Sequence, residues 1–277
     1  MEQLPRLKAR ITSLEELRDL IRALRAMAAS HVQEAQGALA GIRRYAEVVE
    51  RGIAENASLL RSRRAPESVA DIGRRILLVV CSEHGFTGAF NDRLIERAKA
   101  ELRPNVKLGI IGRRGAVLAE ETGLAVEWSI AMATHIGGVP IVARRVADRL
   151  GDIAAARIVF ASYKSGGQYD IKARDILPLD PNLLKASDGE GPPLHQLDPF
   201  VLLRRLSNEY LFAEITRAIM ESLASENGAR LQVMSAADRN IGDRLEGLGR
   251  QFHHLRQEAI TAELLDVVTG AEAVSTS

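Results

Sequence analysis

The sequence predicts an α/β fold that combines a long antiparallel coiled coil of the N- and C-terminal helices with a small Rossmann-like domain containing a parallel sheet. Apolar seams with heptad spacing occur at both ends of the chain, and such seams require a partner helix. Between them, short apolar runs alternate with helical patterns, as in βαβ units. We therefore expect three segments, a helix over residues 1–65, an α/β domain over 73–180 and a second helix over 198–270.

The first long helix carries its seam from Leu17 onward. The seam side chains recur at alternating spacings of four and three residues, which places them on one stripe of a helix. The basic run 61–64 precedes Pro66 and fits the end of this helix, because cations are favoured near a helix C-terminus. The seam positions are Leu17, Ile21, Leu24, Ala28, His31, Ala35, Ala38, Ile42, Tyr45 and Val49.

The middle of the chain alternates strand and helix patterns. Short runs rich in β-branched and apolar residues predict buried strands over 75–81, 107–111 and 157–163, with 171–177 as a further strand at the edge. Helices are expected between them, over 94–102, 117–121 and 139–150. The stretch 178–199 contains five prolines among Gly, Asp and Ser residues and reads as a loop that returns to the last helix.

The last helix is the longest helical pattern, from Asp198 to Val268, with no proline after Pro199. At about 1.5 Å per residue, a helix of roughly 55 to 70 residues would be roughly 80 to 105 Å long, well beyond the diameter of a small domain. It must therefore contact another body or act as a spacer. Its seam positions are Ile241, Leu245, Leu248, Phe252, Leu255, Ala259 and Ala262.

Composition narrows the possible functions. The chain has 277 residues, of which 46% are hydrophobic and 26% charged, as in an ordinary globular protein. Its formal charge of +1 provides no field to attract nucleic acid. The single cysteine, Cys81, ends an apolar run and reads as a small buried side chain. No segment has the roughly twenty apolar residues of a membrane span, so we expect membrane association only through partners.

A nucleotide-binding α/β enzyme with coiled-coil arms is one alternative. Segment 82–91 lies after a strand, where a dinucleotide-binding turn would lie, but its glycines, Gly85 and Gly88, do not have the G-x-G-x-x-G spacing. Gly109, Gly112 and Gly115 also lack it, and the chain has no Walker lysine motif. The glycines are better explained by tight turns between strands and helices. No cofactor is expected.

Other polar candidates for a site are weak. His253 and His254 are adjacent, so on a helix they point about 100° apart and cannot share a metal as an i, i+4 pair can. Glu83 and His84 could form an acid–base pair, but no nucleophile or second carboxylate lies at a matching place. We therefore predict no catalytic residue and no metal site.

Three strings near the C-terminus identify a family. They are IMESLASENGAR from Ile219 to Arg230, RQEAITAEL from Arg256 to Leu264, and VTGA from Val268 to Ala271. These strings are similar to the signature of the gamma subunit of F-type ATP synthases, and the resemblance extends along essentially the whole chain. Segment 82–91 also resembles the family's S-D-R-G-L-C-G-G-[LF]-N. The residues kept there are Ser82, Gly85, Gly88 and Asn91.

The resemblance implies a rotor shaft rather than an enzyme. The paired helices would enter the ring of alpha and beta subunits, while the α/β domain would rest against the epsilon subunit and the membrane c-ring at the cytoplasmic face of the bacterial inner membrane. The shaft would transmit torque between the c-ring and the catalytic ring. The family's Arg-Gln pair, which engages a loop of beta, corresponds to Arg256 and Gln257. A coiled-coil adaptor unrelated to an ATPase remains a second alternative.

Several departures indicate a divergent branch of that family. Asp19 replaces a lysine and Ala26 replaces the second methionine of the family's first helix. In segment 82–91, Glu83, His84 and Thr87 replace Asp, Arg and Cys. The family's Thr-Asp-Asn becomes Asp-Arg-Asn at residues 238–240.

Overall fold

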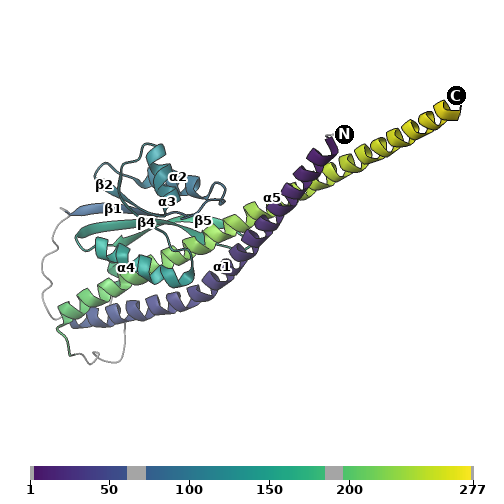
Figure 1. The fold of residues 1–277 in the computed structure, drawn as a ribbon. Helices are drawn as coiled ribbons and strands as arrows, with labels where there is room; N and C mark the ends of the chain where they lie inside the picture. Colours follow the sequence, from purple (N-terminus) through teal and green to yellow (C-terminus); the bar gives the residue numbers. More distant parts are fainter. Residues whose placement is uncertain (1–2, 61–72, 185–195, 276–277) are drawn as a thin grey trace. The chain divides into compact units, whose positions relative to one another are not determined.

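A computed structural model describes residues 3–60, 73–184 and 196–275 (Figure 1). The chain divides into two compact units, one formed by Met1–Met27 with Gln232–Ser277 and the other by Ala28–Leu231. Two long helices contribute to both units, α1 (Gln3–Leu60) and α5 (Pro199–Ser275). The basic run 61–64, which we expected at the end of the first helix, lies outside the described residues.

A five-stranded sheet forms the centre of the second unit. Its spatial order is β3-β2-β1-β4-β5. The first four of these strands run parallel, and β5 pairs with β4 in the antiparallel direction. The strands are β1 (Arg74–Val80), β2 (Val106–Ile111), β3 (Val126–Ile130), β4 (Ile153–Tyr163) and β5 (Tyr169–Leu177).

Helices cover both faces of this sheet. Side chains of β1 alternate between the faces, so that Leu77 and Val79 pack with α2 (Phe90–Glu101) and α3 (Arg113–Glu121). Ile76, Leu78 and Val80 pack on the other face with α4 (Val139–Arg149), α5 and part of α1. Figure 1 shows α2 and α3 on one side of the strands and α4 on the other. The predicted α/β fold with a mainly parallel sheet is confirmed.

The two long helices are antiparallel, as predicted. In the second unit, Tyr45 donates a hydrogen bond to Glu209 at 2.6 Å, and Asn56, farther along α1, donates to the carbonyl of Pro199, nearer the start of α5. In the first unit, the side chain of Arg18 bonds Asp238 at 2.8 Å. Residues with higher numbers in α1 therefore contact residues with lower numbers in α5.

One strand was not expected from the sequence. Strand β3 lies at the edge of the sheet, and its residues alternate between half-buried and exposed, so it lacks the continuous apolar run of a central strand. Trp128 lies across Gly109 of β2, where a Cβ atom would come within 2.7 Å of the indole ring. The glycine inside β2 thus makes room for the neighbouring tryptophan.

The close packing of α3 on β1 generates a stability prediction. A Cβ atom at Gly115 would lie 2.1 Å from Cβ and 2.3 Å from Sγ of Cys81, which is fully buried. We expect Gly115→Ala to lower the free energy of unfolding by about 1–3 kcal/mol, because helix and strand would be forced apart. Urea unfolding measures this change. The matched control is Gly37→Ala in α1, where nothing lies within 4 Å, and it is expected to be neutral or stabilising. Equal effects of the two substitutions would contradict the packing argument.

Candidate functional site

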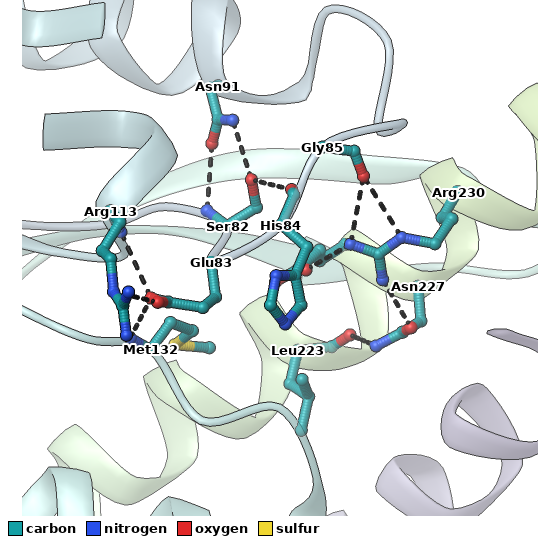
Figure 2. Close-up of polar contacts among 11 residues, drawn as sticks. Ser82, Glu83, His84, Gly85, Asn91, Arg113, Met132, Leu223, Asn227 and Arg230 are labelled. Atoms are coloured by element: carbon teal, nitrogen blue, oxygen red, sulfur yellow. Dashed lines mark hydrogen bonds and ion pairs between the residues drawn. The ribbon is translucent and has the colours of Figure 1, made fainter. Parts of the chain in front are cut away.

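Several buried polar groups of the second unit gather where β1 ends and the loop after it meets α5 (Figure 2). Ser82 begins this loop, and Asn91 of α2 holds it in place. The backbone N–H of Ser82 donates to Oδ1 of Asn91 at 3.0 Å, and Nδ2 of Asn91 donates to the Ser82 hydroxyl at 2.8 Å. That hydroxyl donates in turn to the carbonyl of His84 at 2.9 Å. Two of the residues kept from the family segment therefore fix the path of the loop.

Glu83 acts as an internal anion at the start of α3. Its Oε2 accepts hydrogen bonds from the backbone N–H groups of Arg113 at 3.2 Å and Met132 at 2.8 Å. Its Oε1 lies 2.6 Å from Nε of Arg113. The N-terminus of a helix attracts anions, since its N–H groups and its dipole favour negative charge. Here that position is filled by a carboxylate of the chain itself.

This arrangement disfavours an acid–base pair of Glu83 and His84. Glu83 is buried and paired with Arg113, whereas His84 is exposed. Figure 2 shows the two side chains diverging from the loop. The two groups do not converge on a position where a reacting atom could sit.

Arg230 ties the loop to α5. Its Nε and Nη2 donate to the carbonyl of Gly85 at 3.3 and 3.4 Å, and its Nη1 donates to Oδ1 of Asn227 at 2.8 Å. Its Nη2 also pairs with Glu226 at 2.6 Å. Arg230 is the next-to-last residue of the second unit along α5. It therefore joins the loop after β1 to α5 just before that helix passes into the first unit. We refer to Glu226, Arg230 and the carbonyl of Gly85 as the loop–helix junction.

Glu226 is the carboxyl group of the junction, and burial shifts its pKa. It is only 3% exposed, and burial raises its pKa to about 7 against the opposing effect of Arg230. Its Oε2 has no hydrogen-bond partner among the described residues. The nearby thiol of Cys81 is fully buried, as predicted, and burial together with the charge of Glu226 raises the pKa of that thiol.

Two further buried carboxylates of α5 join it to the sheet and to α1. Glu214 pairs with Arg174 of β5 at 2.8 Å, and burial raises its pKa while Arg174 lowers it. Glu221 lies 3.3 Å from Arg217 and 3.9 Å from Arg43 of α1. Each glutamate is 3% exposed. Removing one partner of such a pair would leave an uncompensated buried charge, which is strongly destabilising.

The predicted seam positions differ in burial. On α1, Leu17 is 44% exposed, Ile21 and Leu24 are half-buried, and Ala28, which belongs to the second unit, is buried. On α5, Ile241 is buried, whereas the later positions are half-buried. Those later positions are Leu245, Leu248, Phe252 and Leu255. The assignment of these residues to one seam stays a prediction.

Arg256 and Gln257 lie on the last part of α5, and both are exposed. Arg256 makes no ion pair with any side chain in the described ranges, so its guanidinium is available to another molecule. Nδ1 of His254, two residues earlier, lies 3.5 Å from Glu258, whereas the ring of His253 packs edge-on to Phe252. Among the described residues, no group of His, Cys, Asp or Glu side chains is arranged to hold a metal ion.

No described helix has both the length and the apolar character needed to cross a membrane.

These features define the class of protein as one with two long antiparallel helices and a small α/β domain. A family model described as ATP synthase matches residues 3–274. An ATP synthase gamma chain from Cereibacter sphaeroides is 30% identical over 295 residues, and the alignment covers 99% of this chain and 100% of that relative. The chain therefore belongs to the ATP synthase gamma chain family.

Solved structures share the fold. A chain from the central stalk and c-ring structure of the Tetrahymena thermophila mitochondrial ATP synthase matches with a TM-score of 0.60 at 20% identity, covering 79% of this chain and 99% of that chain. A chain of the Euglena gracilis mitochondrial ATP synthase matches with a TM-score of 0.63 at 13% identity, covering 99% of this chain and 95% of that chain. At such identities the likeness concerns the fold.

The junction generates a pH prediction. Between pH about 4.5 and about 7 the folded chain keeps a proton on Glu226 that the unfolded chain has released, so this group makes the free energy of unfolding fall as pH rises through that window. Glu226→Gln is expected to remove this contribution. Urea unfolding at about pH 5 and about pH 8 measures it, with the 70% exposed Glu246→Gln as control. A Glu226→Gln variant with the same pH dependence as the control would show that Glu226 does not titrate there.

Proposed function

We propose that this gamma chain is the non-catalytic rotor shaft of a rotary F-type ATP synthase. It would transmit torque between the membrane c-ring and the catalytic ring of alpha and beta subunits. Membership of the gamma chain family supports the role, and so do the solved central-stalk structures that share the fold. The observation that carries the proposal is the end of α5.

The end of α5 continues past the start of α1. The helices are antiparallel, so continuing the register from the contact of Arg18 with Gly242 brings Gln3 level with Gln257. Helix α5 continues from there to Ser275. Large apolar side chains are exposed on this extension, and exposed apolar surface of that kind marks a contact with another protein. They are Ile260, Leu264, Leu265, Val267 and Val268, between 47% and 69% exposed.

Arg256 and Gln257 lie at the start of this extension. The exposure of Arg256 and its lack of an ion pair within the described chain support a role in gripping a carboxylate of the beta subunit. A guanidinium suits such a contact because it can make two parallel hydrogen bonds to one carboxylate. Gln257 would add neutral hydrogen bonds beside it.

The remaining partners follow from the same role. The α/β domain would rest against the epsilon subunit and the c-ring, and the chain would lie at the cytoplasmic face of a bacterial inner membrane, held there by its partners. Its bacterial relatives, such as the gamma chain of Rhizorhabdus wittichii, support this location. A nucleotide-binding enzyme is disfavoured, because Glu83 already fills the anion position at the start of α3.

The proposed beta contact predicts the effect of substituting Arg256. A charge-assisted hydrogen bond contributes about 1.5–3 kcal/mol. Arg256→Ala should therefore lower ATP turnover or assembly of the complex by roughly one to two orders of magnitude. Arg256→Lys should recover only part, since an ammonium cannot make the bidentate contact.

The measurement is subunit co-purification and ATP hydrolysis of the complex expressed with each variant. Arg244→Ala is the matched control, because Arg244 is an exposed arginine of the same helix that points in a different direction from Arg256. Equal effects of Arg256→Ala and Arg244→Ala on co-purification and ATP hydrolysis would contradict the proposed contact of Arg256 with the beta subunit.

The non-catalytic role predicts that the purified chain neither hydrolyses ATP nor binds it tightly. Equilibrium dialysis with ATP and with NAD measures binding and separates the shaft from the enzyme alternative. Micromolar affinity that is abolished by Gly85→Val would favour the enzyme instead. The control is Gly41→Val in α1, where nothing lies within 4 Å.

A further inference from the structure

In the first unit, the carboxylate of Asp238 in α5 pairs with three arginines of α1. Oδ1 of Asp238 lies 2.8 Å from Nε of Arg18 and 3.1 Å from Nε of Arg22, and its Oδ2 lies 3.3 Å from Nη1 of Arg25. The arginines are between 30% and 48% exposed, whereas the side chain of Asp238 is 13% exposed. The carboxylate therefore lies in the interface of α1 with α5, and the guanidiniums close over it.

A glycine one turn further along α5 makes room for this arrangement. A Cβ atom at Gly242 would lie 2.9 Å from Nη2 and 3.4 Å from Cζ of Arg18. The guanidinium of Arg18 therefore lies directly over the backbone of α5 while its Nε reaches Asp238. The hydrogen bond from Arg18, together with the charges of Arg22 and Arg18, holds the pKa of Asp238 below its usual range.

The spacing of the three arginines lets all of them reach Asp238 in only one register of the two helices. They stand at i, i+4 and i+7 on α1, on neighbouring turns of one face. A slip of α1 by four residues in one direction would place Leu14, Arg18 and Ile21 at these positions. The opposite slip would place Arg22, Ala26 and Ala29 there. Either slip would leave Asp238 with one guanidinium instead of three.

An apolar seam alone does not fix this register strongly. Heptad seams repeat every seven residues, so after a slip by seven residues each apolar side chain again faces an apolar position of the partner helix. A single polar group in such an interface is a known means of selecting one register. A seven-residue slip would again bring only one arginine to Asp238, either Arg18 with Ile11 and Glu15, or Arg25 with Ala29 and Val32.

We propose that Asp238 is a positioning residue that fixes the axial register of α1 against α5 in the first unit, through its bonds to Arg18, Arg22 and Arg25. Two helices that cannot slide past each other turn as one body, and a fixed register would therefore help the shaft to transmit torque. This part of the proposal rests on the proposed function. The register itself does not depend on that function and can be measured in the purified chain.

The experiment is a spin-label distance measurement on the full chain. Labels are attached to cysteines placed at Ala26 of α1 and Glu246 of α5, both exposed positions of the first unit, in a Cys81→Ala background. The parent is expected to give one narrow distance distribution. Asp238→Asn keeps the shape of the side chain but removes its charge, and it is expected to add a population displaced along the helix by about 6 or about 10 Å, the rise of four or seven residues.

Two variants serve as controls. Asp238→Glu keeps the charge and is expected to retain the single distribution, and Asp243→Asn removes an exposed carboxylate from the same helix without effect. A single narrow distribution in Asp238→Asn, identical to that of the parent, would overturn the proposal. If that variant loses helix content by circular dichroism, the double variant Arg22→Gln, Arg25→Gln, which leaves one pair as a slipped register does, decides by the same criterion.

A second readout separates this proposal from the proposed function. In the assembled complex, Asp238→Asn should hydrolyse ATP with fewer ions transported per turnover, since slipped helices would transmit torque poorly. A slipped register with unchanged transport would support the positioning role of Asp238 and contradict its part in torque transmission. An unslipped register with reduced transport would overturn the positioning role.

Discussion

The fold depends most on the burial of one stretch of α5 from every side. All residues from Ala218 to Ala229 are buried, including polar and charged ones. A helix surrounded in this way cannot leave its polar side chains to water, so each of them needs a partner within the protein. In the second unit, the sheet and α1 supply partners to these side chains.

The serines of this stretch show how the need is met. Ser222 accepts a hydrogen bond from the N–H of Ala161 in β4 at 3.0 Å and donates to the carbonyl of Val80 in β1 at 3.3 Å. The single hydroxyl proton of Ser225 is shared between the carbonyl of Ala161 at 3.1 Å and that of Glu221 at 2.8 Å. The carboxyl ends of two central strands are thereby bonded to the helix that crosses them. Small hydroxyl side chains permit this, because a larger side chain would separate α5 from the sheet.

Much of the architecture could be predicted from periodicity, but the polar contacts could not. Strands β1, β2 and β4 have continuous apolar runs, which can be recognised in the sequence. Strand β3 alternates between half-buried and exposed residues, so its sequence does not predict a buried strand. Gly109 inside β2 indicates that another segment packs closely there. The string from Ile219 to Arg230 identifies the family, yet its serines and glutamates resemble a solvated helix face. The partners of Glu83 lie 30 and 49 residues away in the chain, so no local pattern could assign that carboxylate its structural part.

The internal carboxylate of Glu83 has a consequence for the conditions in which the chain operates. An open helix N-terminus would take up phosphate or nucleotide according to their concentration, and the local structure would then change with the metabolic state of the cell. Here the anion is part of the polypeptide and cannot dissociate. The anion position at the start of α3 therefore stays filled whatever the concentration of the phosphate and nucleotides that an ATP synthase interconverts.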